Sequence, residues 1–311
     1  MSSLATPQVS IVLPAYDRLR FLQPALASVF AQTFRDWELL VADDGSGAPT
    51  RTWLDSLTSD SRVRILHLPH AGNPAAARNA ALCAARGTYI AFLDSDDLWM
   101  PAKLERQLLA MRAVPARRWS YTAIVRIEAD GVPRTDEPRR LWVPFEGDVV
   151  DALLRSQVGV AMPTVMAERE LVAAAGGFDE SLQVHEDMHL WIKLALRSEV
   201  ACIREPLAQV RCHDEHYSLT GRRAVEGWDR MLASLQSAAQ EPAHAARLAA
   251  VLPRARAQTA ARLARLHAAS GEGRAMLRAL AHGSSYSWRY ADWWAGAALA
   301  TARLITGRRP R

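Results

Sequence analysis

Apolar residues along the first hundred positions follow two alternating patterns. Four short apolar runs are each typical of a buried strand, and they cover residues 9–13, 37–42, 63–68 and 89–93. Between them, residues 21–34 space their apolar side chains at helical intervals, and the Ala-rich residues 75–86 also predict a helix. Strands that alternate with helices indicate a parallel α/β sheet. In such a sheet, ligands bind at the carboxyl ends of the strands.

The pattern becomes less regular beyond residue 100 and changes again near Gly221. Residues 119–127 and 158–166 predict two more strands, and residues 188–197 predict a helix. From Gly221 onward the chain is rich in Ala, Arg and Leu and poor in β-branched residues, which favours helices. We find no fixed-period repeat and no low-complexity linker that divides the chain.

Composition is that of a globular protein, with 50% hydrophobic and 23% charged residues over 311 positions. No run of eighteen uninterrupted apolar residues occurs, which argues against a transmembrane helix. The first eight residues lack the basic and apolar segments of a secretory signal. The three cysteines contain no CxxC pair, so they predict neither a disulfide framework nor a zinc site. These features favour a reducing, cytoplasmic location.

Charge is distributed unevenly along the chain. Residues 221–311 contain 15 Arg, no Lys and 5 acidic residues, whereas residues 1–220 carry 23 basic against 28 acidic residues. Residues 221–311 are a candidate binding surface for anionic lipid, nucleic acid or an acidic acceptor. The alternative is an Arg-rich helical surface that binds no partner. No recognisable nucleic-acid module accompanies the charge, which argues against nucleic-acid binding.

Aromatic and basic residues gather in the last part of this region, over residues 284–311. They are Trp288, Tyr290, Trp293 and Trp294, followed by Arg303, Arg308, Arg309 and Arg311. Trp and Tyr favour membrane interfaces, and Arg attracts anionic lipid. Two interpretations stay open: a peripheral helix that docks on a membrane, or an amphipathic helix that packs on the catalytic domain or another subunit.

Acidic clusters follow two of the predicted strands. Asp94 and Asp96 stand one residue apart, so in an extended backbone both carboxylates point the same way. Together with Asp97 they offer oxygens that suit Mg²⁺ or Mn²⁺, which also takes ligands from substrate phosphates. Asp43 and Asp44 end the second strand in the same manner. Each cluster alone is also typical of a solvated loop or a turn.

Two common nucleotide-binding motifs are missing near this predicted site. The chain has neither G-x-G-x-x-G after the first strand nor G-x-x-x-x-G-K-[ST], which excludes the Rossmann fingerprint and the P-loop. A bound nucleotide is therefore held by another route. Arg78 and a helix N-terminus could supply positive potential for its phosphates.

Six motifs, in order along residues 9–220, resemble those of the family 2 glycosyltransferases of GT-A fold. They are Val9–Tyr16, Trp37–Ser46, Ala77–Asn79, Phe92–Trp99, Gly176–Glu180 and His185–Trp191. The resemblance implies an α/β catalytic domain over residues 1–220 with a mainly parallel central sheet. It divides this domain into a nucleotide-sugar-binding half at about 1–115 and an acceptor-binding half at about 116–220. The Arg-rich residues 221–311 would form a separate helical region.

The same resemblance implies roles for individual nucleotide-site residues. Asp43 would hydrogen-bond the base, with Pro14 and Tyr16 lining its pocket. Arg78 would hold nucleotide or phosphate, and Asp94 would lie near the ribose. These five positions form the predicted donor site.

Metal and catalytic roles follow from the later motifs. Asp96 would bind a divalent metal, Mn²⁺ or Mg²⁺, that bridges the donor diphosphate. Arg211 and His213 stand where many relatives carry a basic residue or His that faces the phosphates or metal, which makes His213 a second candidate metal ligand. Asp187 would be the catalytic base, with Glu186 as the alternative, although either carboxylate could instead cap the helix that follows. Among departures from the family pattern, Asp17 replaces the usual Asn, and His189 replaces a residue that is often acidic.

The implied activity is inverting transfer of a sugar from a nucleotide-diphospho-sugar to a hydroxyl acceptor. A UDP-sugar is the expected donor, and a glycan or lipid-linked glycan of the cell envelope, exopolysaccharide or lipopolysaccharide is the expected acceptor. The enzyme would then work in the cytoplasm or peripherally at the inner face of the cell membrane. Two alternatives remain: a catalytically silent binding or scaffold protein of the same fold, and a sugar nucleotidyltransferase.

Overall fold

A computed structural model describes residues 6–134, 144–213, 221–238, 241–287 and 290–306. The chain divides into two compact units. The first unit contains Met1–Val149, Val158–Glu180 and Leu190–His216. The second contains Val150–Gln157, Ser181–His189 and Tyr217–Arg311.

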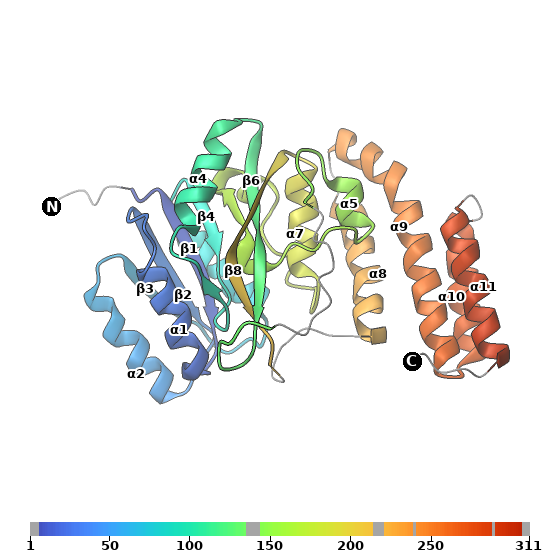
Figure 1. The fold of residues 1–311 in the computed structure, drawn as a ribbon, viewed down its shortest axis with the longest axis horizontal. Coiled ribbons are helices and arrows are strands. Elements are labelled where there is room, and N and C mark those ends of the chain that lie inside the picture. The colour runs from blue at the N-terminus through green and yellow to red at the C-terminus, as the bar shows by residue number, and fades with distance from the viewer. Residues whose placement is uncertain (1–5, 135–143, 214–220, 239–240, 288–289, 307–311) are drawn as a thin grey trace. The chain divides into compact units, whose positions relative to one another are not determined.

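The first unit is built on an eight-stranded sheet in the order β3-β2-β1-β4-β7-β6-β8-β5. Its strands are β1 (Val9–Ala15), β2 (Trp37–Asp43), β3 (Val63–His67), β4 (Tyr89–Phe92), β5 (Leu98–Trp99), β6 (Arg117–Ile127), β7 (Met166–Glu168) and β8 (Glu199–Arg211). The pairs β1–β2, β2–β3, β1–β4 and β6–β8 are parallel (Figure 1). The pairs made by β7 and β5 are antiparallel. The predicted α/β fold with a mainly parallel sheet is therefore confirmed.

Strand β1 illustrates why the apolar runs form the centre of this sheet. Val9, Ile11 and Leu13 alternate along the strand and pack in one core with the buried side chains of α1 (Leu19–Phe30). Six of its seven residues are buried, with neighbours on both faces, as expected of a central parallel strand. Its register places Ala15 opposite Asp43, so β1 and β2 end at the same edge.

Helices and short turns complete the sheet region. They are α2 (Ala48–Ser56), η1 (Leu57–Ser59), α3 (Pro74–Ala84), α4 (Lys103–Ala113), η2 (Met162–Thr164) and α6 (Arg169–Ala174). Asn73 caps α3, because its side-chain oxygen accepts from the backbone N–H of Ala75 at 2.9 Å. Helix α7 (Glu186–Ala195) begins in the second unit and ends in the first.

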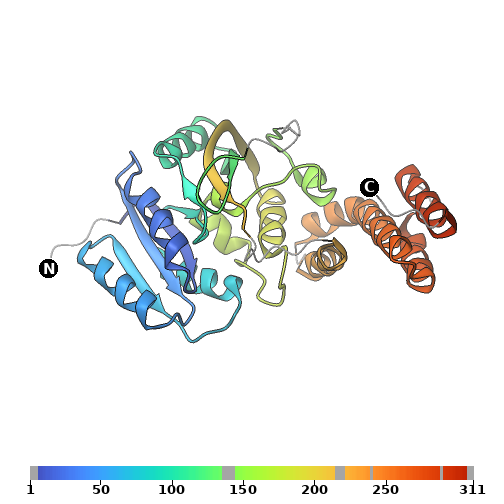
Figure 2. The same cartoon turned by 60° about the horizontal axis from the view of Figure 1, so that its bottom comes forward.

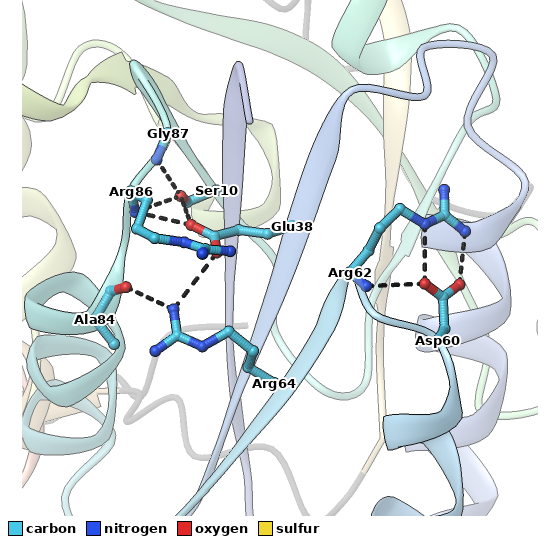
Figure 3. Close-up of polar contacts among 8 residues, drawn as sticks. All are labelled: Ser10, Glu38, Asp60, Arg62, Arg64, Ala84, Arg86 and Gly87. Atoms are coloured by element: carbon cyan, nitrogen blue, oxygen red, sulfur yellow. Dashed lines mark hydrogen bonds and ion pairs between the residues drawn. The ribbon is translucent and has the colours of Figure 1, made fainter. Parts of the chain in front are cut away.

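A buried carboxylate joins the starting ends of the central strands (Figure 3). Glu38 on β2 accepts from the Ser10 hydroxyl at 2.7 Å and from the backbone and guanidinium of Arg86 at 2.7–2.9 Å. Burial raises the pKa of Glu38, but the hydrogen bonds from Ser10 and Arg86 outweigh burial and lower it overall. Gly87 completes the junction, since a Cβ there would lie 2.5 Å from the backbone nitrogen of Ser10.

The second unit is helical, as the composition beyond Gly221 predicts. It contains α5 (Val150–Leu154), α8 (Gly221–Ala238), α9 (Pro242–Ala269), α10 (Gly273–Ser287) and α11 (Ala291–Thr306). Helix α9 packs against α8, α10 and α11, and Figure 2 shows α9 to α11 side by side in orange to red. No helix within the described residues is long and apolar enough to cross a bilayer.

Two elements differ from the sequence-based expectation. Residues 158–166 are predicted as a strand, but only Met166 belongs to one, as the first residue of β7. Residues 158–165 form extended chain and the short 3-10 helix η2, because Pro163 lacks the N–H that a sheet ladder requires. The thirteen-residue strand β8 has no clear apolar alternation and was not predicted. It pairs with β6 over ten positions, with register shifts near Thr122 and Ala123.

Candidate active site

Asp43, the predicted base-binding residue, lies at the carboxyl end of β2 with no exposed surface. Its Oδ1 accepts from the backbone N–H of Ser46 at 3.0 Å, and its Oδ2 lies 2.8 Å from His67 Nδ1. Burial raises the pKa of Asp43, but the hydrogen bonds from Ser46 and His67 lower it overall. Asp43 is therefore an ionised carboxylate that both neighbours fix in position.

His67 connects Asp43 to a second carboxylate. Its Nε2 lies 2.8 Å from Asp55 Oδ1. Hydrogen bonds to Asp43 and then to Asp55 raise the pKa of His67 above its usual value. Sequence analysis did not find this residue as part of the site, because the bridge joins positions on β2, β3 and α2 that carry no shared motif.

An exposed aromatic pair borders the same edge of the sheet. The Tyr16 ring is 47% exposed and stacks on His70 with the ring centroids 4.3 Å apart. His70 Nδ1 lies 2.8 Å from the carbonyl oxygen of Asp44, whose carboxylate accepts from the backbone of Ala71 at 2.7 Å. Pro14, the other predicted pocket residue, precedes Tyr16 by two positions and is partly buried in β1. An exposed aromatic pair of this kind is a surface on which a planar base could stack.

Gly45 allows the Asp44 loop to approach His70 closely. Its φ of +75° lies in the left-handed region, and a Cβ would stand 2.8 Å from His70 Cβ. Asp17 also has a positive φ, of 49°, and its carboxylate accepts from the backbone of Gly47 at 2.9 Å. The Asp that departs from the family pattern thus ties the loop after β1 to the loop after β2.

Arg78 and Asp94 come together across sixteen positions of sequence. The Arg78 guanidinium on α3 donates to Asp94 Oδ1 at 2.6 Å and lies over the Phe178 ring at 5.5 Å from its centroid. Arg78 is buried, whereas 27% of the Asp94 side chain is exposed. The fixed positive charge is the kind of group that binds a phosphate or diphosphate.

Asp96 and His213, the two predicted metal ligands, are neighbours in space. His213 Nε2 lies 2.9 Å from Asp96 Oδ2, and the imidazole stacks on Phe21 with centroids 4.6 Å apart. Arg211 fixes the loop that carries Asp96. Its Nε donates to the carbonyl oxygen of Asp96 at 2.8 Å and its backbone N–H to Asp97 Oδ1 at 2.9 Å.

The Asp94, Asp96 and Asp97 carboxylates of this loop lie close enough to repel one another. Burial is the main cause that raises the pKa of Asp97, and the charges of Asp96 and Asp94 raise it further. A bound cation would relieve this repulsion. Asp97 itself is buried and hydrogen-bonded to Arg211, so it is a support for the loop rather than an open ligand.

The donor set fits a metal that takes most of its ligands from elsewhere. Asp96 Oδ2 and His213 Nε2 offer one carboxylate and one imidazole at adjacent positions, and 13% of the Asp96 side chain remains exposed. No group of three or more His, Cys, Asp or Glu able to hold a metal occurs among the described residues. Mg²⁺ is commonly held by one or two carboxylates together with water and substrate phosphates, and Asp96 offers one such carboxylate.

Glu186 and Asp187, the predicted base and its alternative, lie in the first turn of α7 and belong to the second unit. Asp187 Oδ1 accepts from the backbone N–H of Met188 at 2.6 Å, and its side chain is partly exposed. Glu186 is buried, with 9% of its surface exposed. Of the two carboxylates, Asp187 is therefore the more accessible to solvent.

The sequence profile of Glycosyl transferase family 2 matches residues 10–158. A glycosyltransferase of Rickettsia felis is 34% identical over 204 residues, which are 66% of this chain and 33% of that protein. The chain spans about a third of the length of this and two further Rickettsia relatives. The Bacillus subtilis protein TuaG, named for teichuronic acid biosynthesis, is 31% identical over 66% of this chain and 79% of its own.

A third relative is named for a defined reaction. The Escherichia coli protein WfgD, called a UDP-Glc:alpha-D-GlcNAc-diphosphoundecaprenol beta-1,3-glucosyltransferase, is 46% identical over 103 residues, covering 33% of this chain and 40% of WfgD.

Two solved structures share the fold at low sequence identity. S. aureus TarS 1-349 in complex with UDP-GlcNAc has a TM-score of 0.65 at 15% identity and covers 98% of this chain and 93% of its own. The mannosyltransferase PcManGT of Pyrobaculum calidifontis, in complex with GDP-Man and Mn²⁺, has a TM-score of 0.60 at 17% identity, over 97% and 86% of the two chains. With the profile match and the TuaG relationship, the chain belongs to Glycosyl transferase family 2 and has its GT-A fold.

Proposed function

We propose that this chain transfers a sugar, with inversion, from a nucleotide-diphospho-sugar to a hydroxyl acceptor. The Asp96–His213 pair carries the proposal, because it offers adjacent carboxylate and imidazole donors at 2.9 Å with part of Asp96 open to solvent. The Arg78–Asp94 pair supports it, because Asp94 stands two positions before Asp96 and Arg78 on α3 adds a buried guanidinium. A UDP-sugar is the favoured donor, since TarS 1-349 binds UDP-GlcNAc and WfgD is named for UDP-Glc.

Donor binding follows from the first unit. Tyr16 and His70 offer a stacking surface for the base, and the fixed Asp43 carboxylate shapes the loop beside it. Asp94 would meet the ribose, while Arg78 holds phosphate oxygens. Asp96 and His213 would hold Mn²⁺ or Mg²⁺, which supplies positive charge for the diphosphate that leaves.

Catalysis requires removal of a proton from the acceptor. The acceptor oxygen forms a bond to the anomeric carbon on the face opposite the nucleoside diphosphate, whose bond to that carbon breaks. Asp187 accepts the hydroxyl proton, with Glu186 as the alternative base. A positioned base of this kind contributes about 10²–10⁴-fold to the rate.

The acceptor belongs to the same proposal. We assign a glycan or lipid-linked glycan of the cell envelope, because WfgD is named for a diphosphoundecaprenol-linked acceptor and TuaG for teichuronic acid biosynthesis. Residues 1–220 would form the catalytic domain, with donor contacts before about residue 115 and acceptor contacts after it. Residues 221–311 would form the helical region.

Helix α11 supports a peripheral location at the inner face of the membrane. Six exposed positions on this helix carry no charge: Trp294, Ala295, Ala298, Leu299, Thr301 and Ala302. The neighbouring α10 exposes Leu277 beside Arg274 and Arg278. An uncharged face with an exposed Trp, in a region of net positive charge, suits the surface of an anionic bilayer. Trp288, Arg308, Arg309 and Arg311, and the side chains of Asp292 and Arg303, lie outside the described residues.

Donor hydrolysis tests the proposal. A panel of nucleotide sugars is incubated with the wild type in Mn²⁺, Mg²⁺ or EDTA, and with Asp96→Ala and the control Glu170→Ala, which changes an exposed carboxylate on α6. We expect slow hydrolysis of one donor that is lost with EDTA and in Asp96→Ala but kept in Glu170→Ala.

Calorimetry separates the alternatives if no donor is hydrolysed. Metal-dependent donor binding without turnover in the presence of acceptor glycans would favour the silent scaffold. Absence of all nucleotide binding with metal present would overturn the transferase proposal. Release of pyrophosphate from a nucleoside triphosphate and a sugar phosphate would instead identify a nucleotidyltransferase.

A further inference from the structure

The segment that leads into α7 has an unusual backbone. His185 has a φ of +63°, in the left-handed region that costs a residue with a side chain about 1–2 kcal/mol. It stands directly before Glu186 and Asp187. Such a conformation persists only where surrounding contacts fix it. The contacts around His185 therefore fix the position of the first turn of α7, which carries the Glu186 and Asp187 carboxylates.

Helix α8 provides these contacts within the second unit. His185 Nε2 lies 2.9 Å from the carbonyl oxygen of Ala224, within hydrogen-bond distance. The imidazole also meets the Trp228 ring edge-on, with centroids 5.1 Å apart and an interplanar angle of 81°. Trp228 is 9% exposed, so this contact is enclosed rather than on the surface. One turn of α8 thus holds the His185 ring by a polar and an aromatic contact.

Gly227 brings the α8 backbone close to the same segment. A Cβ at this position would overlap Val184 Cγ2 and lie 3.4 Å from His185 Cδ2. Gly costs about 1 kcal/mol relative to Ala inside a helix, and Gly227 stands in the interior of α8. Close approach to Val184 and His185 is a physical reason for glycine there.

A second contact lies on the other side of the carboxylates. His189, one turn into α7, has its Nε2 3.3 Å from Ser234 Oγ on α8. Helix α8 therefore contacts the chain both before and after Glu186 and Asp187. Between these contacts, the bond from Met188 N–H to Asp187 Oδ1 at 2.6 Å fixes the carboxylate relative to the backbone.

We infer that α8 positions the catalytic base, with Gly227 and Trp228 as positioning residues that fix His185 and so the Asp187 carboxylate. This inference rests on the proposed function, which assigns the base to Asp187 or Glu186. It gives part of the Arg-rich helical region a role in catalysis, although no residue of α8 takes part in the bond changes. A small displacement of a base can reduce turnover about a hundredfold without changing donor binding.

Gly227→Ala is the direct test, with Gly283→Ala as its matched control. Gly283 on α10 is also buried in a helix contact, where a Cβ would lie 2.7 Å from Ala260 Cβ. Both variants are measured for kcat, donor KM and Tm with the donor identified above. We expect Gly227→Ala to lower kcat about tenfold or more with donor KM within twofold, and Gly283→Ala to lower Tm with kcat unchanged.

Trp228 offers a milder pair of variants if Gly227→Ala does not fold. Trp228→Phe keeps an aromatic edge for His185, whereas Trp228→Ala removes it. We expect Trp228→Phe to retain more of the wild-type kcat than Trp228→Ala, again with donor KM unchanged. Equal kcat for both variants and the wild type would overturn the role of Trp228.

Asp187→Asn and Glu186→Gln separate failure of this inference from failure of the proposed function. If both retain the wild-type kcat, the proposed base is wrong. If either is inactive while Gly227→Ala turns over like the wild type, only the positioning inference fails. If Gly227→Ala and Gly283→Ala lower kcat equally, the effect is general destabilisation, and the inference is overturned.

Discussion

Asp43, His67 and Asp55 form a hydrogen-bonded chain in which one imidazole joins two carboxylates. Asp43 is fully buried, whereas 61% of the Asp55 side chain is exposed. The pKa of His67 is raised by Asp43 first and by Asp55 second, and the pKa of Asp43 is lowered in spite of burial. The protonated imidazole and the ionised Asp43 therefore stabilise each other in the folded state.

This pair predicts a pH-dependent stability. Because the folded pKa of His67 lies above the unfolded value of about 6.5, its contribution is fully present below that pH and is lost as pH rises through the folded pKa. We expect His67→Asn to lower the free energy of unfolding by about 1 kcal/mol at pH 5.5 and by less at pH 9. Urea denaturation at both values measures it, with His282→Asn on the exposed face of α10 as control. An equal loss at both pH values would contradict the assignment.

The sequence names candidate residues of the donor site but not the pairs that they form. Asp94 belongs to a motif just after β4 and Arg78 to a motif on α3, and the structure brings these two within 2.6 Å. His67 and His70 could not be identified, because their bonds to Asp43 and Asp44 connect loops that only the folded sheet brings together. The acidic motifs identify the carboxylates of the site from the sequence. The register of β1, β2 and β3 determines which side chains come within hydrogen-bond distance.

Strand β2 depends at its starting end on the Glu38 cluster shown in Figure 3. Glu38 is buried and receives bonds from Ser10 on β1 and from Arg86 before β4. A single carboxylate therefore connects three neighbouring segments of the sheet. Asp60 and Arg62, in the same figure, form an ion pair whose side chains are about one-third exposed. The two residues stand only two positions apart in the sequence, so the pair is local.

Removing the two carboxylates should have different effects on stability. We expect Glu38→Gln to lower the free energy of unfolding by about 2 kcal/mol, because buried donors lose a charged acceptor. Asp60→Asn should cost less than about 1 kcal/mol, as measured for partly exposed ion pairs. Thermal unfolding of both variants measures the difference, and donor affinity of the folded Glu38→Gln protein should match the wild type. Equal losses of unfolding free energy in the two variants would show that the Glu38 interactions stabilise the fold no more than a surface ion pair does.

A strand can be predicted from the sequence when its residues are uniformly apolar and buried, and less well when exposed residues interrupt it. Strands β1 to β4 are short apolar runs in the parallel part of the sheet, and all four were expected near their observed bounds. Strand β8 was missed because Arg204, Glu205 and Pro206 interrupt it at exposed positions. Its pairing with β6, rather than its own pattern, keeps it extended.

At the scale of the whole molecule, positive charge and uncharged exposed surface occur in the same third of the chain. Residues 221–311 contain 15 Arg and no Lys, against 5 acidic residues. The described face of α11 carries no charge over six exposed positions. Membrane contact through this uncharged face and the positive charge around it would be interfacial and dependent on ionic strength.

Vesicle binding tests this contact. We expect the full chain to sediment with vesicles of phosphatidylglycerol and phosphatidylcholine, but not with phosphatidylcholine alone. Leu299→Glu should reduce binding about tenfold, because it places a charge in the apolar interface. Leu109→Glu is the matched control, since Leu109 is also exposed, at 63% against 52% for Leu299, but lies on α4. Equal binding by both variants would place the contact elsewhere.

The close contacts between α9, α10 and α11 rely on very small side chains. Gly283 faces Ala260, and Gly296 faces Ala261 so closely that a Cβ added to Gly296 would lie 2.6 Å from the Ala261 Cβ. Such contacts remove little apolar area from water per residue, so the helices gain less transfer free energy than the Leu- and Val-rich strands. Backbone amides in α9 to α11 should therefore exchange with deuterium through local opening, well before those of β1 and β2. Mass-resolved exchange would then show two populations of peptides, those of α9 to α11 and those of β1 and β2.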